Sequence, residues 1–222
     1  MHNDTEYIII SDVHLGSRYC LHELFLHFLD DLPEKATLIL NGDTVDDPDK
    51  ELPAEHRIIL KRLRDESCRR RIIWLQGNHD DQYIPTDPAK IEFIPDFSIG
   101  KRLYVSHGFD FDNIMPRNRH FIMAFRLFHR FRMKLGASPV HVARYAKKWS
   151  ALYKILRRHV VSNAIEHAAE NGFEAVTCGH THFAEDLKIR GIRYINTGAW
   201  TEKPVYYLHV DRKKMTLCQY KG

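Results

Sequence analysis

Five short apolar segments, each followed at once by polar residues, constrain the fold of this chain more than any other feature. The segments are residues 7–10, 37–40, 72–75, 103–105 and 175–178. Their length and their β-branched content predict buried strands. Residues 21–29 and 54–64 have the apolar spacing of helices and lie between the first three segments. Strands separated by helix-length segments predict a layered α/β architecture.

The polar residues that follow the five segments carry the groups that bind metals. The seven candidates are Asp12, His14, Asp43, Asn78, His107, His180 and His182. Sites in open α/β sheets form at the carboxyl ends of strands, so we expect these side chains in one crevice. Seven donors are too many for one ion with an open position, and they suit two ions that share one carboxylate. Without a nearby Cys, a thiolate zinc site is not expected.

Each motif taken alone has an ordinary structural explanation. Asp12 and His14 could belong to a loop or a cap, and Asp43 could be a turn residue, since Asp is common in turns. His107 alone could be a hydrogen-bonded histidine of the core. The five motifs in fixed order after five strands favour the metal centre over these alternatives.

Together the motifs resemble those of the calcineurin-like metallophosphoesterase superfamily. They are Asp12-x-His14, Gly42-Asp43-x-x-Asp46, Gly77-Asn78-His79-Asp80, His107-Gly108 and Gly179-His180-x-His182. The resemblance implies an α/β fold built as a four-layer α/β/β/α sandwich. It implies one metal on Asp12, His14, Asp43 and His182, and a second on Asp43, Asn78, His107 and His180, with Asp43 bridging.

The resemblance also implies a reaction. Two ions lower the pKa of a water, which attacks the phosphorus of a phosphoester or an anhydride. His79 is then the general acid that protonates the leaving oxygen, and Asp80 orients its imidazole. The alternative for Asp80 is a helix N-cap or a turn residue.

A basic stretch separates the fourth strand from the fifth. Residues 113–165 contain no Asp or Glu and twelve Lys and Arg. Apolar residues at helical spacing predict helices over 121–135, 140–156 and 160–170. We therefore expect a single domain, residues 1–222, with an inserted basic helical lid at about 113–172. Behind the lid, residues 187–195, 204–210 and 214–220 are β-rich and predict antiparallel or mixed pairing.

The lid and the segment Asn196-Thr197-Gly198-Ala199-Trp200 give a layout similar to that of the UDP-2,3-diacylglucosamine hydrolases. This likeness implies cleavage of a pyrophosphate bond in a nucleotide-linked glycolipid at the inner face of the membrane, usually with manganese; iron and zinc also suit these donors. Those hydrolases carry Arg where this chain has His79. The alternatives are therefore a soluble phosphodiesterase or phosphatase acting on small nucleotides, or a non-catalytic scaffold with the same fold.

The basic helices have more than one possible explanation. Aromatic residues beside Lys and Arg suit an anionic membrane surface. The apolar stripe could equally pack on the core or on a second copy of the chain in a homodimer. Nucleic acid is not expected, because no recognition motif is present. The longest run without a charged residue is ten residues, too short to span a bilayer, and no signal peptide is visible. Four separated cysteines without a Cys-x-x-Cys pair favour a cytoplasmic location.

Overall fold

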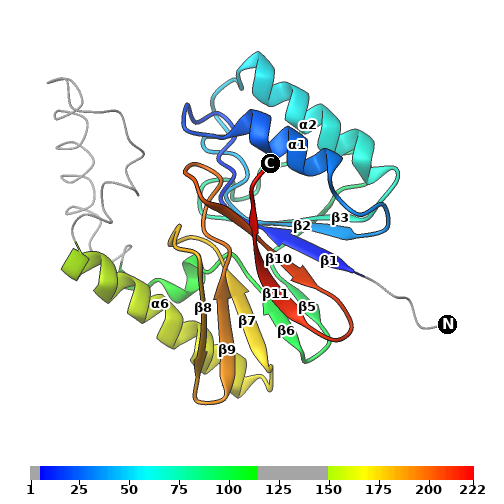
Figure 1. Cartoon of the computed structure of the whole chain (residues 1–222). Helices are drawn as coiled ribbons and strands as arrows, with labels where there is room; N and C mark the ends of the chain where they lie inside the picture. The colour runs from blue at the N-terminus through cyan, green and yellow to red at the C-terminus, as the bar shows by residue number, and fades with distance from the viewer. Residues whose placement is uncertain (1–5, 115–149) are drawn as a thin grey trace, which may run out of the picture.

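The computed structural model describes residues 6–114 and 150–222, which form two β-sheets packed face to face (Figure 1). The first sheet has the strand order β11-β10-β1-β2-β3-β4, and the second has the order β5-β6-β7-β9-β8. The strands of the first sheet are β1 (Tyr7–Ile10), β2 (Thr37–Asn41), β3 (Ile72–Leu75), β4 (Glu92–Ile94), β10 (Val205–Val210) and β11 (Met215–Tyr220). Those of the second are β5 (Phe97–Ile99), β6 (Leu103–Val105), β7 (Ala175–Cys178), β8 (Glu185–Ile189) and β9 (Ile192–Asn196).

The alternation of side chains along β1 explains why the first sheet is covered on both faces. Ile8 and Ile10 point toward the helices α1 (His22–Asp30) and α2 (Ala54–Ser67) and belong to the apolar cluster on that side. Ile9 points the other way and joins the cluster between the two sheets, because successive residues of a strand face opposite sides. A strand buried on both faces is apolar throughout, as the sequence of β1 shows.

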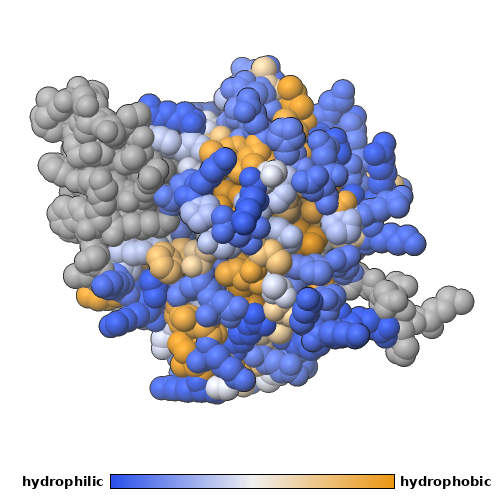
Figure 2. All heavy atoms as spheres, viewed as in Figure 1, coloured by the Kyte–Doolittle hydropathy of each residue, from blue (hydrophilic) through white to orange (hydrophobic). Residues whose placement is uncertain are grey.

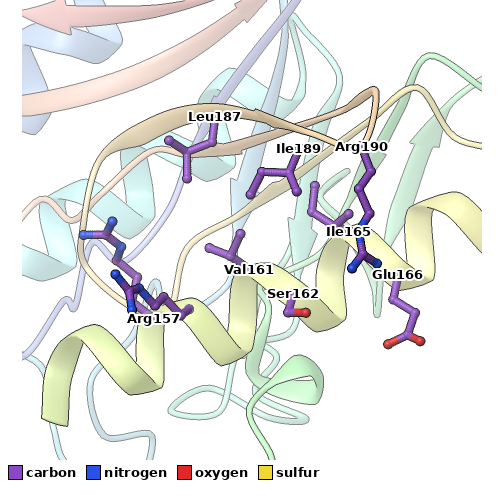
Figure 3. Close-up of a pocket in the computed structure, with 9 residues that line it drawn as sticks. Arg157, Val161, Ser162, Ile165, Glu166, Leu187, Ile189 and Arg190 are labelled. Atoms are coloured by element: carbon purple, nitrogen blue, oxygen red, sulfur yellow. The ribbon is translucent and has the colours of Figure 1, made fainter. Parts of the chain in front are cut away.

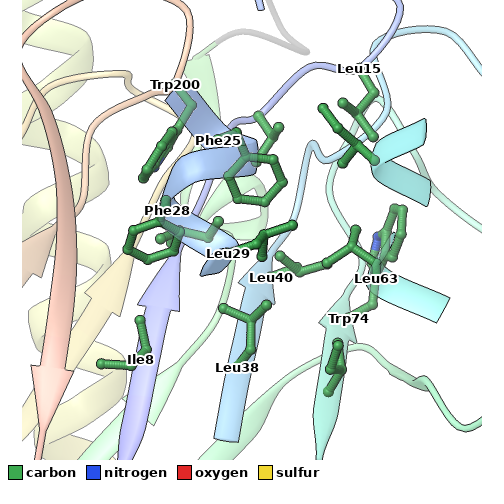
Figure 4. Packing of buried hydrophobic residues seen from close by; sticks show 14 of the residues in the cluster. Ile8, Leu15, Phe25, Phe28, Leu29, Leu38, Leu40, Leu63, Trp74 and Trp200 are labelled. Atoms are coloured by element: carbon green, nitrogen blue, oxygen red, sulfur yellow. The ribbon is translucent and has the colours of Figure 1, made fainter. Parts of the chain in front are cut away.

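The outer layer on the first sheet is held by aromatic packing. Phe25 and Phe28 of α1 lie against Trp200, with ring centroids 5.2 and 4.8 Å from the indole (Figure 4). Leu63 of α2 and Trp74 of β3 belong to the same cluster and are fully buried. Burial of side chains of this size stabilises the fold by about 1.5–3 kcal/mol each.

The fourth layer is helix α6 (Ser150–Glu170), which covers the outer face of the second sheet (Figure 1). Val160 and Ala164 of α6 pack against Val176 of β7 and Tyr194 of β9. The layers are therefore α/β/β/α, and the predicted fold class is confirmed. The C-terminal strands β8–β9 and β10–β11 are antiparallel hairpins, as their sequence predicted.

Two details differ from the sequence-based expectation. Helix α6 is continuous, where the apolar spacing predicted separate helices over 140–156 and 160–170; no Gly or Pro interrupts 150–170. The short strands β4 and β5 were not predicted, since each contains a polar residue, Glu92 or Ser98, and neither is a continuous apolar run. Of the predicted lid, residues 115–149 lie outside the described residues, while the C-terminal half of α6 is a packed layer of the sandwich.

The visible surface is mostly hydrophilic, with small apolar areas between charged ones (Figure 2). Exposed large apolar side chains include Ile58 of α2, Ile155 of α6 and Ile189 of β8. Among the described helices, none has both the length and the apolar character that crossing a membrane requires.

Candidate metal centre

All seven candidate ligands lie in loops that leave the carboxyl ends of parallel strands. The first sheet supplies Asp12 and His14 after β1, Asp43 after β2 and Asn78 after β3. The second sheet supplies His107 after β6, and His180 and His182 after β7. Because the two sheets pack face to face, their loops meet at one edge of the sandwich. Side-chain contacts there join His182 to Asp12 and His14, Asp43 to His107, and Asn78 to His180.

One group of donors converges around two imidazoles. His14 Nε2 lies 3.2 Å from His182 Nε2, and Asp12 Oδ1 lies 3.1 Å from the same His182 nitrogen. His14, Asp12 and His182 are all buried, and their ligand atoms lie within 4.8 Å of one another. Two ring nitrogens and a carboxylate oxygen at this spacing form a set that could hold a divalent cation.

A second group meets the first at Asp43. Asp43 Oδ2 lies 3.3 Å from His107 Nε2 and 4.0 Å from His14 Nε2, so this carboxylate stands between the two groups. His180 Nδ1 lies 2.8 Å from Asn78 Oδ1, and the backbone N–H of His180 donates to Asp12 Oδ2 at 3.1 Å. Asp43 therefore lies where one carboxylate could contact ions held by both groups.

The backbone at these positions is unusual. Five candidate ligands have a left-handed backbone, with φ between 51° and 60°. They are Asp12, His14, Asp43, His180 and His182. Residues with a side chain rarely adopt this region, and such conformations gather at functional sites. The adjacent glycines are required for space, because a Cβ on Gly179 would lie 2.3 Å from Asp12 Oδ2, and one on Gly77 would lie 2.2 Å from the Asp43 nitrogen.

The candidate ligands include a buried cluster with negative charge, which positive charge would stabilise. Burial opposes ionisation of Asp12, but the nearby imidazoles of His182 and His107 lower the pKa of Asp12 to about 2. Burial opposes protonation of His107, but the charges of Asp43 and Asp12 raise the pKa of His107 to about 10. Asp12 Oδ1 and His107 Nε2 are also buried without a hydrogen bond among the described residues. Two buried carboxylates and orphaned donor atoms fit a pair of divalent cations.

His79 and Asp80 lie beside this group but do not contact each other in the expected way. His79 Nδ1 donates to the Asp46 carbonyl oxygen at 2.8 Å, and Asp46 Oδ1 lies 3.6 Å from the same nitrogen. Asp80 is buried, and its two oxygens accept five N–H groups. These donors are the backbone amides of Gly77, Asp43, Thr44 and Val45 and the indole of Trp74. The His79 ring is therefore held by Asp46, whereas Asp80 fixes the loops after β2 and β3.

Two carboxylates at the site were given no role by the sequence. Asp46 Oδ1 lies 3.0 Å from His14 Nδ1, and Asp112 Oδ2 lies 2.9 Å from His180 Nε2. Asp46 could have been found, because it closes the Gly42-Asp43-x-x-Asp46 motif. Asp112 follows His107 by five residues in a turn, and no sequence pattern marks it.

A groove of about 310 Å³ lies apart from these ligands, between α6 and the β8–β9 hairpin (Figure 3). Its apolar lining includes Val161, Ile165 and Leu187, and Arg157 and Arg190 flank it. None of the seven candidate ligands lines this groove.

The two facing sheets, the outer helices and the Asp and His donors at one edge define a metallophosphoesterase. The family model described as calcineurin-like phosphoesterase matches residues 6–184. The chain belongs to this family, and the resemblance seen in the motifs is confirmed. A comparison with curated protein sequences gave no match.

Solved structures with the same fold are only distantly similar in sequence. Vps29 from Chaetomium thermophilum is 12% identical, with a TM-score of 0.51 over 96% of this chain and 86% of that chain. The phosphoesterase YfcE from E. coli is 16% identical, with a TM-score of 0.47 over 95% of this chain and 90% of that chain. An archaeal phosphodiesterase is 13% identical, with a TM-score of 0.48 over 97% and 99%. At these identities the likeness concerns the fold alone.

Proposed function

We propose that the chain is a dinuclear metal-dependent hydrolase of phosphoesters or pyrophosphates. One ion would be held by Asp12, His14, Asp43 and His182, and the other by Asp43, Asn78, His107 and His180. The observation that carries the proposal is that His14 from the first sheet and His107 from the second meet at Asp43, with Asp12 Oδ1 and His107 Nε2 buried and without a hydrogen bond among the described residues. Manganese is the metal we propose, and iron or zinc would suit the same donors.

When bound, the two ions would supply a water of lowered pKa as the nucleophile and would neutralise charge on the phosphate. The chain's own residues do the rest. Asp12 and Asp43 are buried and ionised, so they concentrate negative charge where the ions bind. The contact between the Asp46 carboxylate and His14 Nδ1 fixes that ring with its Nε2 toward Asp12 and Asp43.

His79 is the residue that we propose as the general acid. Its Nδ1 is occupied by the bond to the Asp46 carbonyl, so Nε2 is the nitrogen that can carry a proton to a leaving group. Its side chain is 31% exposed, in contrast to the buried His14 and Asp43, and its ring packs edge-on against His14 at 4.9 Å between centroids. A partly exposed imidazole beside the ligands can reach a substrate oxygen without binding a metal itself.

For the substrate we propose a nucleotide- or lipid-linked anion such as UDP-2,3-diacylglucosamine. Support comes from the basic stretch 113–165 and from its described part, where Lys154 and Arg158 are exposed on α6 beside Ile155. Cationic and apolar side chains together suit a lipid with a phosphate group, and peripheral contact with an anionic membrane would follow. A soluble phosphodiesterase acting on small nucleotides is the second candidate. It is favoured by His79, since the UDP-2,3-diacylglucosamine hydrolases carry Arg at this position.

The test is a comparison of manganese-loaded wild-type protein with Asp43→Ala and His79→Gln. Wild type should bind two ions per chain and hydrolyse phosphoesters. Asp43→Ala should lose activity and bind fewer ions, whereas His79→Gln should keep both ions and lose about 10²–10⁴-fold in turnover on poor leaving groups. Wild-type protein with well under two ions per chain would favour the non-catalytic scaffold.

The substrate class is tested in the same assay. Activity on UDP-2,3-diacylglucosamine should far exceed activity on small nucleotide diesters when both are supplied at equal concentration. Equal or greater activity on the small diesters would identify the soluble phosphodiesterase instead.

A further inference from the structure

A carboxylate with no assigned role touches one of the proposed ligands from behind. Asp112 Oδ2 lies 2.9 Å from His180 Nε2, and the Asp112 side chain is 1% exposed. The other nitrogen of the same ring, Nδ1, lies 2.8 Å from Asn78 Oδ1. His180 therefore stands between a buried carboxylate and the proposed second ion site.

Backbone and side-chain hydrogen bonds hold Asp112 in this place. It is the residue after the 3₁₀ helix η1 (Phe109–Phe111), and its N–H donates to the Phe109 carbonyl at 3.0 Å. The Phe111 carbonyl accepts from Asn163 of α6 at 2.8 Å, so η1 is tied to the fourth layer. Asp112 Oδ1 accepts the N–H of Ile114 at 3.0 Å, and Oδ2 is the oxygen that faces His180.

The direction of the Asp112 bond decides the tautomer of His180. An ionised carboxylate can only accept, so the proton in this bond belongs to His180 Nε2. In the neutral ring Nδ1 then has a lone pair, and it faces the Asn78 amide oxygen, which is also an acceptor. Two acceptors 2.8 Å apart are complementary to a cation rather than to each other.

We propose that Asp112 is the positioning residue of the second metal site, because it holds His180 in the tautomer whose Nδ1 can bind an ion. The proposal rests on the proposed function, since it needs His180 to be a ligand. A carboxylate behind a ligating imidazole orients the ring and raises its basicity, and loss of such a contact weakens metal binding about 10–100-fold.

Asp112→Asn is the sharpest test, because the change is nearly isosteric and reverses one hydrogen bond. Its Oδ1 can still accept from Ile114, which turns Nδ2 toward His180 Nε2 as a donor. Nε2 must then accept, so the proton moves to Nδ1 and is donated to Asn78 Oδ1. The variant keeps its shape but presents an N–H where the ion should bind.

The first measurement is ¹⁵N NMR of histidine-labelled, metal-free full-length protein, with the His180 signal assigned by its loss in His180→Gln. Wild type should show His180 protonated on Nε2, and Asp112→Asn should show it protonated on Nδ1. This readout does not depend on activity. The same tautomer in both proteins would overturn the proposal.

The second measurement is calorimetric titration with Mn²⁺ of wild type, Asp112→Asn, Asp112→Ala and the control Asp110→Asn, a change at an exposed position of the same turn. Asp112→Ala should weaken one of two sites about 10–100-fold, Asp112→Asn should weaken it more, and Asp110→Asn should match wild type. A merely structural role predicts the reverse order, because the alanine variant alone loses the bond to Ile114. Wild-type protein that binds no metal would contradict the proposed function, whereas normal binding by Asp112→Asn would contradict only the role of Asp112.

Discussion

At the scale of single residues, the site contains strained backbone conformations that place the side chains of the candidate ligands. Asp43 has φ of 51°, a region that costs an L-residue roughly 1–2 kcal/mol. The neighbouring loop fixes it there, because the Asp43 amide donates to Asp80 and its Oδ1 accepts from the His79 amide. The conformation aims the carboxylate between His14 and His107.

This strain gives a prediction in which two variants with the same lost donor differ in stability. Both Asp43→Ala and Asp43→Gly remove the carboxylate, but glycine adopts positive φ without cost. In metal-free protein, Asp43→Gly should be more stable than Asp43→Ala by about 1 kcal/mol. Urea unfolding of the two variants measures the difference, and equal or reversed stability would contradict the argument from strain.

Asp80 carries a second prediction, which concerns stability rather than catalysis. Its oxygens accept five N–H groups in a buried site, and an asparagine would present an amide N–H to some of those donors. We expect Asp80→Asn to lower the free energy of unfolding by about 1.5–3 kcal/mol. Chemical denaturation checks this, with the exposed neighbour in Asp81→Asn as the control, which should be close to neutral. Similar losses in both variants would speak against it.

At the scale of elements, the loop after β1 is tied to α2 by a histidine. The Gly16 N–H donates to His56 Nδ1 at 2.7 Å, so this ring nitrogen carries no proton. Burial, followed by the nearby His22, lowers the pKa of His56 below its usual 6.5. The unfolded chain therefore binds the proton more readily than the folded one.

The sign of the pH dependence follows. The contribution of neutral His56 to the free energy of unfolding is complete above pH 6.5. It is lost as the pH falls through the lower pKa that His56 has in the folded protein. We expect the wild-type chain to lose about 1 kcal/mol more than His56→Gln between pH 7 and pH 5, since protonation breaks the bond from Gly16. Urea unfolding of both proteins in the presence of a chelator measures the gap. A gap that stays constant with pH would rule the explanation out.

The elements differ in how well the sequence predicted them. Strands β1, β2, β3, β6 and β7 were predicted because buried parallel strands are continuous apolar runs with polar residues directly after them. The short strands β4 and β5 contain polar residues and are not continuous apolar runs. Helix α6 lacks the clear apolar stripe that would have shown one unbroken helix.

The site shows the same division. The seven candidate ligands were named from motifs, and the structure places them together; their metal-binding roles remain a proposal. The contacts of Asp46 and Asp112 were not foreseen, because a carboxylate in a turn is usually a local turn residue. Its long-range partner, His14 or His180, depends on how loops from different strands meet, and neither local spacing nor composition encodes that.

At the scale of the whole molecule, the candidate ligands are divided between the two sheets. Asp12, His14 and Asp43 follow strands of the first sheet, whereas His107, His180 and His182 follow strands of the second. An ion bound by both groups joins the sheets at one edge. Metal binding should therefore stabilise the whole fold and not only the loops.

This arrangement gives the prediction for metal removal. With Mn²⁺ at a free concentration 100 times its dissociation constant, each site should add about 2.7 kcal/mol to the free energy of unfolding. Excess EDTA should abolish the gain, and Asp43→Ala should show little of it. Thermal unfolding with and without the metal checks this, and a melting temperature that ignores the metal would argue against ligands shared between the sheets.

The antiparallel hairpin β10–β11 continues the first sheet beyond β1, and Trp200 stands just before it. The Trp200 backbone N–H donates to the Asp12 carbonyl at 2.9 Å, and its carbonyl accepts from Leu21 at the start of α1. Trp200 thus supports the loop after β1, and the strand β10 that follows it pairs with β1 itself. A chain that ends before Trp200 would lack both of these backbone bonds, so the loop that carries Asp12 would lose its support from this side.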